Sequence, residues 1–287
     1  MNRAKALWDL MRLEHGFMLF MAVLIGAFIA EQGIPPADRL FFAFLTPMFL
    51  EASTFALNDY FDYEMDKKNK RTDRPLVRGD LDRNTALYVF VILFPFGILS
   101  SYFVNWTCFL IALFTGALSV LYDGWMKRVK LLGNFYIAYI MAVPFIFGAT
   151  AVSPDLSSIV LFMASIAFLT GVGREIMKDI MDFKGDKELG VKSFPSLIGL
   201  KKSRVTSAFF YIAAVFLSFI PFFYGIDGVY YMNYAYFGLV LVTDAMLLYT
   251  SLVLFFGEGI DMKFQRKFTL LAIFIGLLAF LIGVIVA

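Results

Sequence analysis

The sequence has too few charged residues for a soluble domain of its size. Charged side chains make up 17% of its 287 residues, whereas hydrophobic residues make up 60% and 35 residues are phenylalanine. A soluble globular domain is about a quarter charged and cannot bury so many large apolar side chains. The composition therefore excludes an ordinary soluble protein.

Cysteine is also almost absent. Cys108, the only cysteine, lies inside an apolar run, which excludes a disulfide framework and cysteine metal sites. The first residues, MNRAKALWDLMRLEHG, lack the short apolar core and small-residue cleavage site of a signal peptide. Because no stretch has the composition of a linker or a low-complexity region, we expect a single domain over residues 1–287.

The sequence is rich in apolar segments of about 20 residues, the length that a helix needs to cross the hydrocarbon core of a bilayer. They predict an all-α, polytopic membrane protein with nine transmembrane helices. The predicted segments are 14–32, 40–57, 84–104, 106–122, 132–152, 157–177, 205–224, 230–255 and 268–287.

The basic residues are distributed unevenly between the two sides of these segments. Every lysine and arginine except Arg39 falls in or next to the N-terminal segment or an even-numbered loop. Cytoplasmic loops of membrane proteins carry an excess of these residues. We therefore predict a multi-pass cell-membrane protein whose N-terminus and even-numbered loops are cytoplasmic and whose C-terminus lies outside.

Two of these loops carry the same pattern of aspartates. NDYFDYEMD (58–66) follows the second segment, and DIMDFKGD (179–186) follows the sixth. This repeat predicts two related four-helix units followed by a ninth helix. Four residues of the first unit have an identical residue 120 positions later. The pairs are Asp59 and Asp179, Asp62 and Asp182, Asp66 and Asp186, and Pro75 and Pro195.

Spacings of three and four residues place such carboxylates near one another on a helix, where they repel each other unless a cation compensates. Hard divalent cations prefer carboxylate oxygens, and Mg²⁺ usually binds through a few carboxylates together with substrate phosphate oxygens. Basic residues that suit an anion follow both clusters, which predicts a diphosphate site. A solvated membrane-proximal face would carry similar charges, but the identical repeat favours the metal site. The basic residues are Lys67, Lys68, Lys70, Arg71, Arg74 and Arg78 after the first cluster, and Lys184, Lys187 and Lys192 after the second.

These residues resemble the signatures of the UbiA superfamily of intramembrane prenyltransferases. The signature NDxxDxxxD matches residues 58–66, and a KDxxDxxGD-like signature matches 178–186. A weaker one, a tyrosine followed by Lys-Arg and Gly-Asn pairs, matches residues 122–134, with Asp123 where the family usually has serine. The resemblance implies nine transmembrane helices around a central cavity, with the motifs on its cytoplasmic side.

The resemblance also implies roles for individual residues. Asp59 and Asp179 would anchor basic residues or help to deprotonate the acceptor, and the other four motif aspartates would act through bound metal. The implied Mg²⁺ ligands are Asn58, Asp62, Asp66, Asp182 and Asp186. The implied contacts to a prenyl diphosphate are Asn58, Arg78, Tyr122, Lys127, Arg128 and Lys178.

The implied reaction ionises the allylic diphosphate, transfers the prenyl group to a lipophilic acceptor and releases diphosphate, with no nucleic-acid partner. The stretch 173–199 most resembles the archaeal branch that transfers geranylgeranyl to the glycerol hydroxyl of geranylgeranylglyceryl phosphate. Many members carry an R-P-x-N segment that reads RLEH (12–15) here. Arg12 and His15 are therefore the candidate acceptor contacts, and an aromatic acceptor of the hydroxybenzoate, quinone or chlorophyll type stays open.

Two other classes of membrane protein fit the sequence less well. Transporters bind their substrate near the bilayer midplane, where this chain offers only Glu51 and Asp244. Each of these two is either functional or a hydrogen-bonded group inside the bundle. A CDP-alcohol phosphotransferase needs DGxxAR, but Asp123-Gly124 is followed by Trp-Met-Lys.

Overall fold

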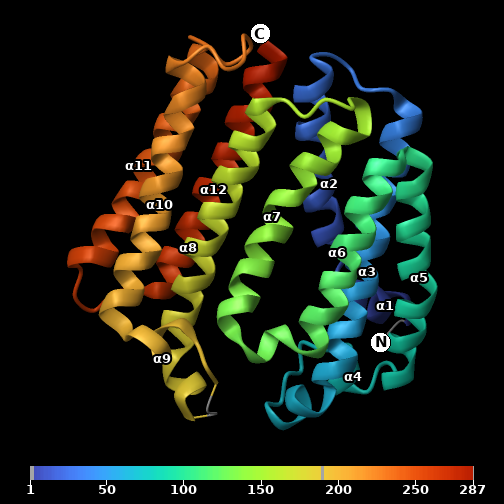
Figure 1. Cartoon of the computed structure of the whole chain (residues 1–287). Coiled ribbons are helices and arrows are strands. Elements are labelled where there is room, and N and C mark those ends of the chain that lie inside the picture. The colour runs from blue at the N-terminus through green and yellow to red at the C-terminus, as the bar shows by residue number, and fades with distance from the viewer. Residues whose placement is uncertain (1–2, 189–190, 287) are drawn as a thin grey trace.

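The computed structural model describes residues 3–188 and 191–286, apart from the side chain of Arg128. Helices account for most of this chain and run nearly parallel in one bundle (Figure 1). They are α1 (Arg3–Met11), α2 (Leu13–Glu31), α3 (Ala37–Lys68), α4 (Pro75–Arg78), α5 (Arg83–Val104), α6 (Trp106–Gly124), the 3₁₀ helix η1 (Met126–Arg128), α7 (Lys130–Val152), α8 (Ser158–Glu188), α9 (Phe194–Ile198), α10 (Leu200–Phe223), α11 (Tyr234–Phe256) and α12 (Met262–Val286).

Within the described ranges, nine helices are long and apolar enough to cross a membrane. They coincide with the nine predicted segments, so the prediction of an all-α polytopic membrane protein is confirmed. Two of them extend beyond their predicted ends, since α3 continues from 57 to Lys68 and α8 from 177 to Glu188. Both aspartate motifs therefore lie on the last turns of spanning helices and not in loops.

The order of the elements repeats along the chain. Helices α2 to α6 and helices α7 to α11 each run as two long helices, one short helix and two long helices, and α12 follows. The short helices α4 and α9 carry Pro75 and Pro195 in their first turns, and both prolines are buried. In each unit the motif-bearing helix packs against the next long one, α3 on α5 and α8 on α10. This order supports the prediction of two four-helix units and a ninth helix.

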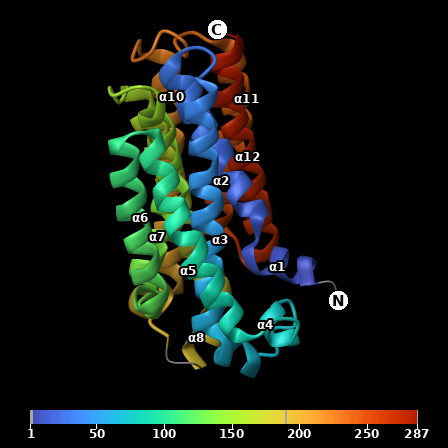
Figure 2. The same cartoon turned by 90° about the vertical axis from the view of Figure 1, so that its right-hand side faces the viewer.

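The two motif ends lie at the same end of the bundle. Both views place α4 and the end of α8 at this end, and the end of α12 at the opposite end (Figure 1, Figure 2). The short helix α1, which the sequence did not predict, also lies near this end (Figure 1). The chain turns between α1 and α2 at Arg12, which has a left-handed backbone with φ 46°. This turn brings the Arg12 side chain to the first motif.

The two units are joined where α2 packs closely against α7. A Cβ atom on Gly26 would lie 2.1 Å from the carbonyl oxygen of Phe145, and one on Gly148 would lie 1.9 Å from that of Val23. Only a hydrogen atom fits at either position. Small residues allow helix backbones to approach in this way inside a membrane.

We predict that Gly148→Ala lowers the thermal unfolding midpoint of the detergent-solubilised protein, since the added methyl group must separate α2 from α7. Overpacking of this kind costs about 1–3 kcal/mol or more. Gly238→Ala in α11 is the matched control, because a Cβ atom there meets nothing within 4 Å. Equal midpoints for the two variants would contradict the close packing of the units.

Candidate active site

A cavity of about 450 Å³ opens beside the first motif. Its polar lining includes Asn58, Asp123 and Arg174. A second, mainly apolar pocket shares Glu51 and five other lining residues with it and continues deeper between the helices. The structure therefore contains the expected central cavity, with a polar mouth and an apolar interior. The shared lining residues are Leu19, Glu51, Thr54, Ser119, Tyr136 and Ile140.

The first motif contains two aspartates that bind arginines and face the protein. Asp59 and Asp66 are seven residues apart and so lie on the same side of α3. Asp59 is only 2% exposed and pairs with Arg12 and, at 3.5 Å, with Nη1 of Arg74. Nε of Arg74 lies 3.6 Å from Asp66. Arg74 therefore neutralises both carboxylates.

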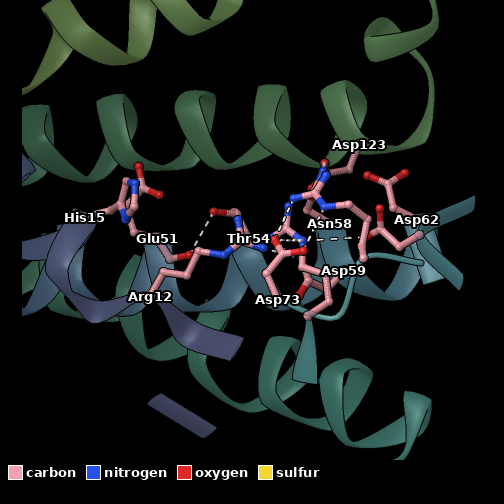
Figure 3. Close-up of polar contacts among 12 residues, drawn as sticks. Arg12, His15, Glu51, Thr54, Asn58, Asp59, Asp62, Asp73 and Asp123 are labelled. Carbon is pink, nitrogen blue, oxygen red and sulfur yellow. Dashed lines mark hydrogen bonds and ion pairs between the residues drawn. The ribbon is translucent and has the colours of Figure 1, made fainter. Parts of the chain in front are cut away.

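Asp62 and Asn58 have different surroundings from these two aspartates. The Asp62 side chain is 29% exposed, and one of its oxygens lies 2.5 Å from Nζ of Lys127. Asn58 donates a 2.7 Å hydrogen bond to Asp123, the residue that replaces the family's usual serine. Glu51, Asn58 and Asp62 follow one another along α3, and Asp123 approaches from the facing helix (Figure 3). Asp123 thus orients Asn58 at the mouth of the cavity.

The second motif repeats the buried anchor with different partners. Asp179 is 3% exposed and accepts hydrogen bonds from Nδ2 of Asn134 at 2.9 Å and the backbone N–H of Phe194 at 3.1 Å. Nζ of Lys130 lies 3.5 Å from Asp179 and 2.6 Å from Asp186. Lys130 therefore lies close to two aspartates of the second motif, as Arg74 does in the first motif.

Arg74 and Phe194 occupy equivalent positions in the repeat, one residue before the prolines of α4 and α9. In the first unit the arginine side chain contacts the buried aspartate, and in the second unit the backbone N–H contacts it. The repeat thus preserves a buried anchor while the chemistry of its partner differs. Asp182, the middle aspartate of the second motif, has no hydrogen-bond or ion-pair partner in the described ranges.

The segment between α6 and α7 contacts both motifs. It supplies Lys127 to Asp62 and Lys130 to Asp186. Val129 also forms an isolated parallel bridge with Lys192, which follows the second motif. Lys127 was predicted from the sequence as a site residue, but Lys130, the first residue of α7, was not. The signal for Lys130 was a third basic residue in the same short stretch of sequence.

Several predicted diphosphate contacts have protein partners here. Arg78 pairs with Asp80 at 2.6 Å and Asp9 at 2.8 Å, and the hydrogen bond to Asp80 raises the pKa of its guanidinium. Lys178 donates to Glu175 at 2.8 Å. Tyr122 lines the cavity. The side chain of Arg128 lies outside the described part of the chain.

The two predicted acceptor contacts lie in different places. Arg12 is paired with Asp59 and its guanidinium carbon sits 4.4 Å from the ring centre of Phe55. His15 lines the cavity. The cavity lining also includes Arg174, which was not predicted from the sequence. Its buried Nε has no hydrogen-bond partner among the described residues.

In the ranges that the structure describes, no three His, Cys, Asp or Glu side chains gather closely enough to hold a metal ion by themselves. All the motif aspartates except Asp182 lie beside a lysine or an arginine instead. The donors nearest to the mouth are still oxygen atoms, the type that Mg²⁺ prefers.

The model of the UbiA prenyltransferase family matches residues 19–270 of this sequence. The chain belongs to this family. The expected membership, and with it a membrane-bound prenyltransferase activity, is confirmed. The transporter and CDP-alcohol phosphotransferase alternatives are thereby set aside, whereas the roles of individual site residues stay predictions.

Curated relatives match almost the whole chain. A digeranylgeranylglyceryl phosphate synthase from Archaeoglobus fulgidus is 43% identical over 280 residues, which cover 97% of this chain and 95% of the relative. One from Pyrococcus horikoshii is 34% identical and covers 97% of each chain.

Solved structures share the fold. A structure that concerns digeranylgeranylglyceryl phosphate synthase in membranes superposes with a TM-score of 0.85 at 30% identity and covers both chains completely. A UbiA homolog from Archaeoglobus fulgidus, bound to GPP and Mg²⁺, superposes with a TM-score of 0.66 at 16% identity over 97% of this chain and 99% of that one.

We predict that Asp59→Asn lowers the thermal unfolding midpoint much more than Asp62→Asn does. Asp59 is buried between two arginines, and the loss of one partner from a buried ion pair costs about 3–5 kcal/mol. The pair of Asp62 with Lys127 is partly exposed and is worth about 1 kcal/mol or less. Equal losses in the two variants would show that both aspartates are structural.

Proposed function

We propose that this protein transfers the geranylgeranyl group of geranylgeranyl diphosphate to the glycerol hydroxyl of geranylgeranylglyceryl phosphate. An ether forms and diphosphate is released. The geometric support is a cavity that is lined in part by Asn58 and that shares six lining residues with a mainly apolar pocket. This shape suits a ligand with a diphosphate head and a long hydrocarbon tail. The names of relatives that match 97% of the chain support the same substrates.

The diphosphate would lie at the mouth, where lysines bind both motifs. Lys127 and Lys130 are held there by Asp62 and Asp186, so their positive charges are in place before the ligand arrives. Preorganised cations stabilise the charge that develops on a leaving diphosphate. The apolar pocket reaches Thr46 on α3, twelve residues and roughly 18 Å along the helix from Asn58. It would hold the tail and exclude water from the reacting carbon.

We further propose that Mg²⁺ is the cofactor. Asn58 lines the cavity, Asp62 lies one turn further along α3, and Asp182 lies in the last turns of α8 at the same end of the bundle (Figure 1, Figure 2). Their oxygen atoms, with those of Asp66 and Asp186 one turn beyond the two aspartates, would hold the metal. Bound there with oxygens of the diphosphate, the metal would neutralise charge on the leaving group. Asp182, without a partner of its own in the described ranges, is the aspartate most available for this role.

The acceptor would bring its phosphate to Arg174. This side chain lines the cavity, and its Nε is buried without a hydrogen-bond partner among the described residues. Its Nη1 lies 3.8 Å from the carboxylate of Glu175. A guanidinium group binds phosphate through paired hydrogen bonds. By the distribution of lysines and arginines, we propose that the mouth and the N-terminus face the cytoplasm.

The test is an assay of the purified protein in detergent with Mg²⁺, labelled geranylgeranyl diphosphate and a panel of acceptors. We expect ether formation with geranylgeranylglyceryl phosphate, and no product with hydroxybenzoate. Chelation of Mg²⁺ should stop the reaction. A product with the aromatic acceptor alone would overturn the proposed acceptor and leave the family membership intact.

In the same assay we predict that Asp62→Ala and Asp182→Ala each lower kcat/KM about 100-fold or more, by analogy with the loss of other charge-stabilising groups. Asp155→Ala is the control, because Asp155 lies in the exposed α7–α8 loop, outside the cavity. Near-full turnover of either motif variant at limiting Mg²⁺ would contradict the two-motif site.

A further inference from the structure

Glu51 is an acidic residue in the membrane-spanning part of α3, seven residues and roughly 10 Å deeper than Asn58. It lines both the polar cavity and the apolar pocket. Within the described ranges its carboxylate has no hydrogen-bond or ion-pair partner. The backbone oxygen of the residue accepts a 3.2 Å hydrogen bond from the hydroxyl of Thr54.

Asp244 shows how this chain treats another acid inside a spanning helix. Asp244 lies in α11, lines a different pocket and accepts a 2.7 Å hydrogen bond from Ser218. A carboxyl group in an apolar environment is costly unless it is paired, and such groups in membrane helices often serve function. The open position of Glu51 in the cavity therefore points to a ligand as its partner.

We propose that Glu51 is the catalytic base that takes the proton from the acceptor hydroxyl. This inference rests on the proposed function. The reacting carbon of the prenyl group joins the diphosphate to the hydrocarbon tail, so it must lie where the polar cavity meets the apolar pocket. Glu51 belongs to both linings and marks this boundary.

The two aspartates that the sequence offered as candidate bases are less well placed. Asp59 is buried beneath Arg12 and Arg74, and Asp179 is occupied by Asn134 and a backbone N–H. Both aspartates therefore suit an anchoring role better than proton transfer, and their roles stay predictions.

The proposed reaction is a substitution at the allylic carbon of the prenyl diphosphate. The C–O bond to the diphosphate breaks and its electron pair leaves with the diphosphate. A lone pair of the acceptor hydroxyl forms the new C–O bond of the ether. The hydroxyl proton passes to the carboxylate of Glu51, which returns it to water after the products leave.

The test compares Glu51→Gln with wild-type enzyme in single-turnover reactions that separate ether from prenyl alcohol. We expect Glu51→Gln to bind geranylgeranyl diphosphate as tightly as wild type but to lower kcat about 100-fold, the usual size of a general-base contribution. The ratio of prenyl alcohol to ether should rise, because water captures the prenyl group that the acceptor no longer intercepts. Glu51→Asp, which keeps the carboxyl group, should restore part of the ether. Asp244→Asn is the matched control and should leave the ratio unchanged.

Wild-type turnover in Glu51→Gln would overturn the proposal. So would a fall in kcat with an unchanged product ratio, or a folded Glu51→Asp variant that behaves like Glu51→Gln, because a packing role predicts both. If wild type uses only an aromatic acceptor, the proposed function fails, and the same product ratio measured with that acceptor still decides the role of Glu51.

Discussion

Six aspartates at one end of a membrane bundle must be balanced by positive charge, and the rest of the site depends on how this balance is achieved. Carboxylates near an apolar medium repel one another strongly when unpaired. Here Arg12 and Arg74 serve the first motif and Lys130 serves the second, while Lys127 pairs with Asp62. The turn at Arg12 and the short segment before α7 therefore connect helices and also supply positive charge to the motif aspartates.

This balance divides the aspartates into two kinds. Asp59 and Asp179 are buried and hold neighbouring segments to the motif helices. Asp62 is more exposed and touches a lysine that a ligand can recruit, and Asp182 has no partner in the described ranges. In the proposed function both kinds have a role, because a site that gathers diphosphate and metal must first be held open without them. Glu51 also has a carboxylate without a hydrogen-bond or ion-pair partner in the described ranges, and it lines the apolar pocket.

Much of this arrangement could be predicted from the sequence, because its signals lie in short, recognisable stretches of residues. Apolar length and the placement of lysines identified the nine helices, and the 120-residue displacement identified both motifs. The pairings could not be predicted, because they depend on which segments fold back onto the motif helices. Arg74 stands in a run of six basic residues after the first motif, and only the structure shows that it contacts two aspartates. Helix α1 was missed because its nine residues are shorter than the window of about 11–18 residues in which a helical period can be recognised.

The central claim is that the two motifs hold one diphosphate together. A double-mutant cycle on the Mg²⁺-dependent binding of an unreactive prenyl thiodiphosphate tests it most directly, with Asp62→Asn, Asp182→Asn and the double variant. Groups that act on one ligand are coupled, whereas independent groups have additive effects. We expect the double variant to bind little more weakly than either single variant. Losses of binding free energy that simply add would show that the motifs act at separate sites.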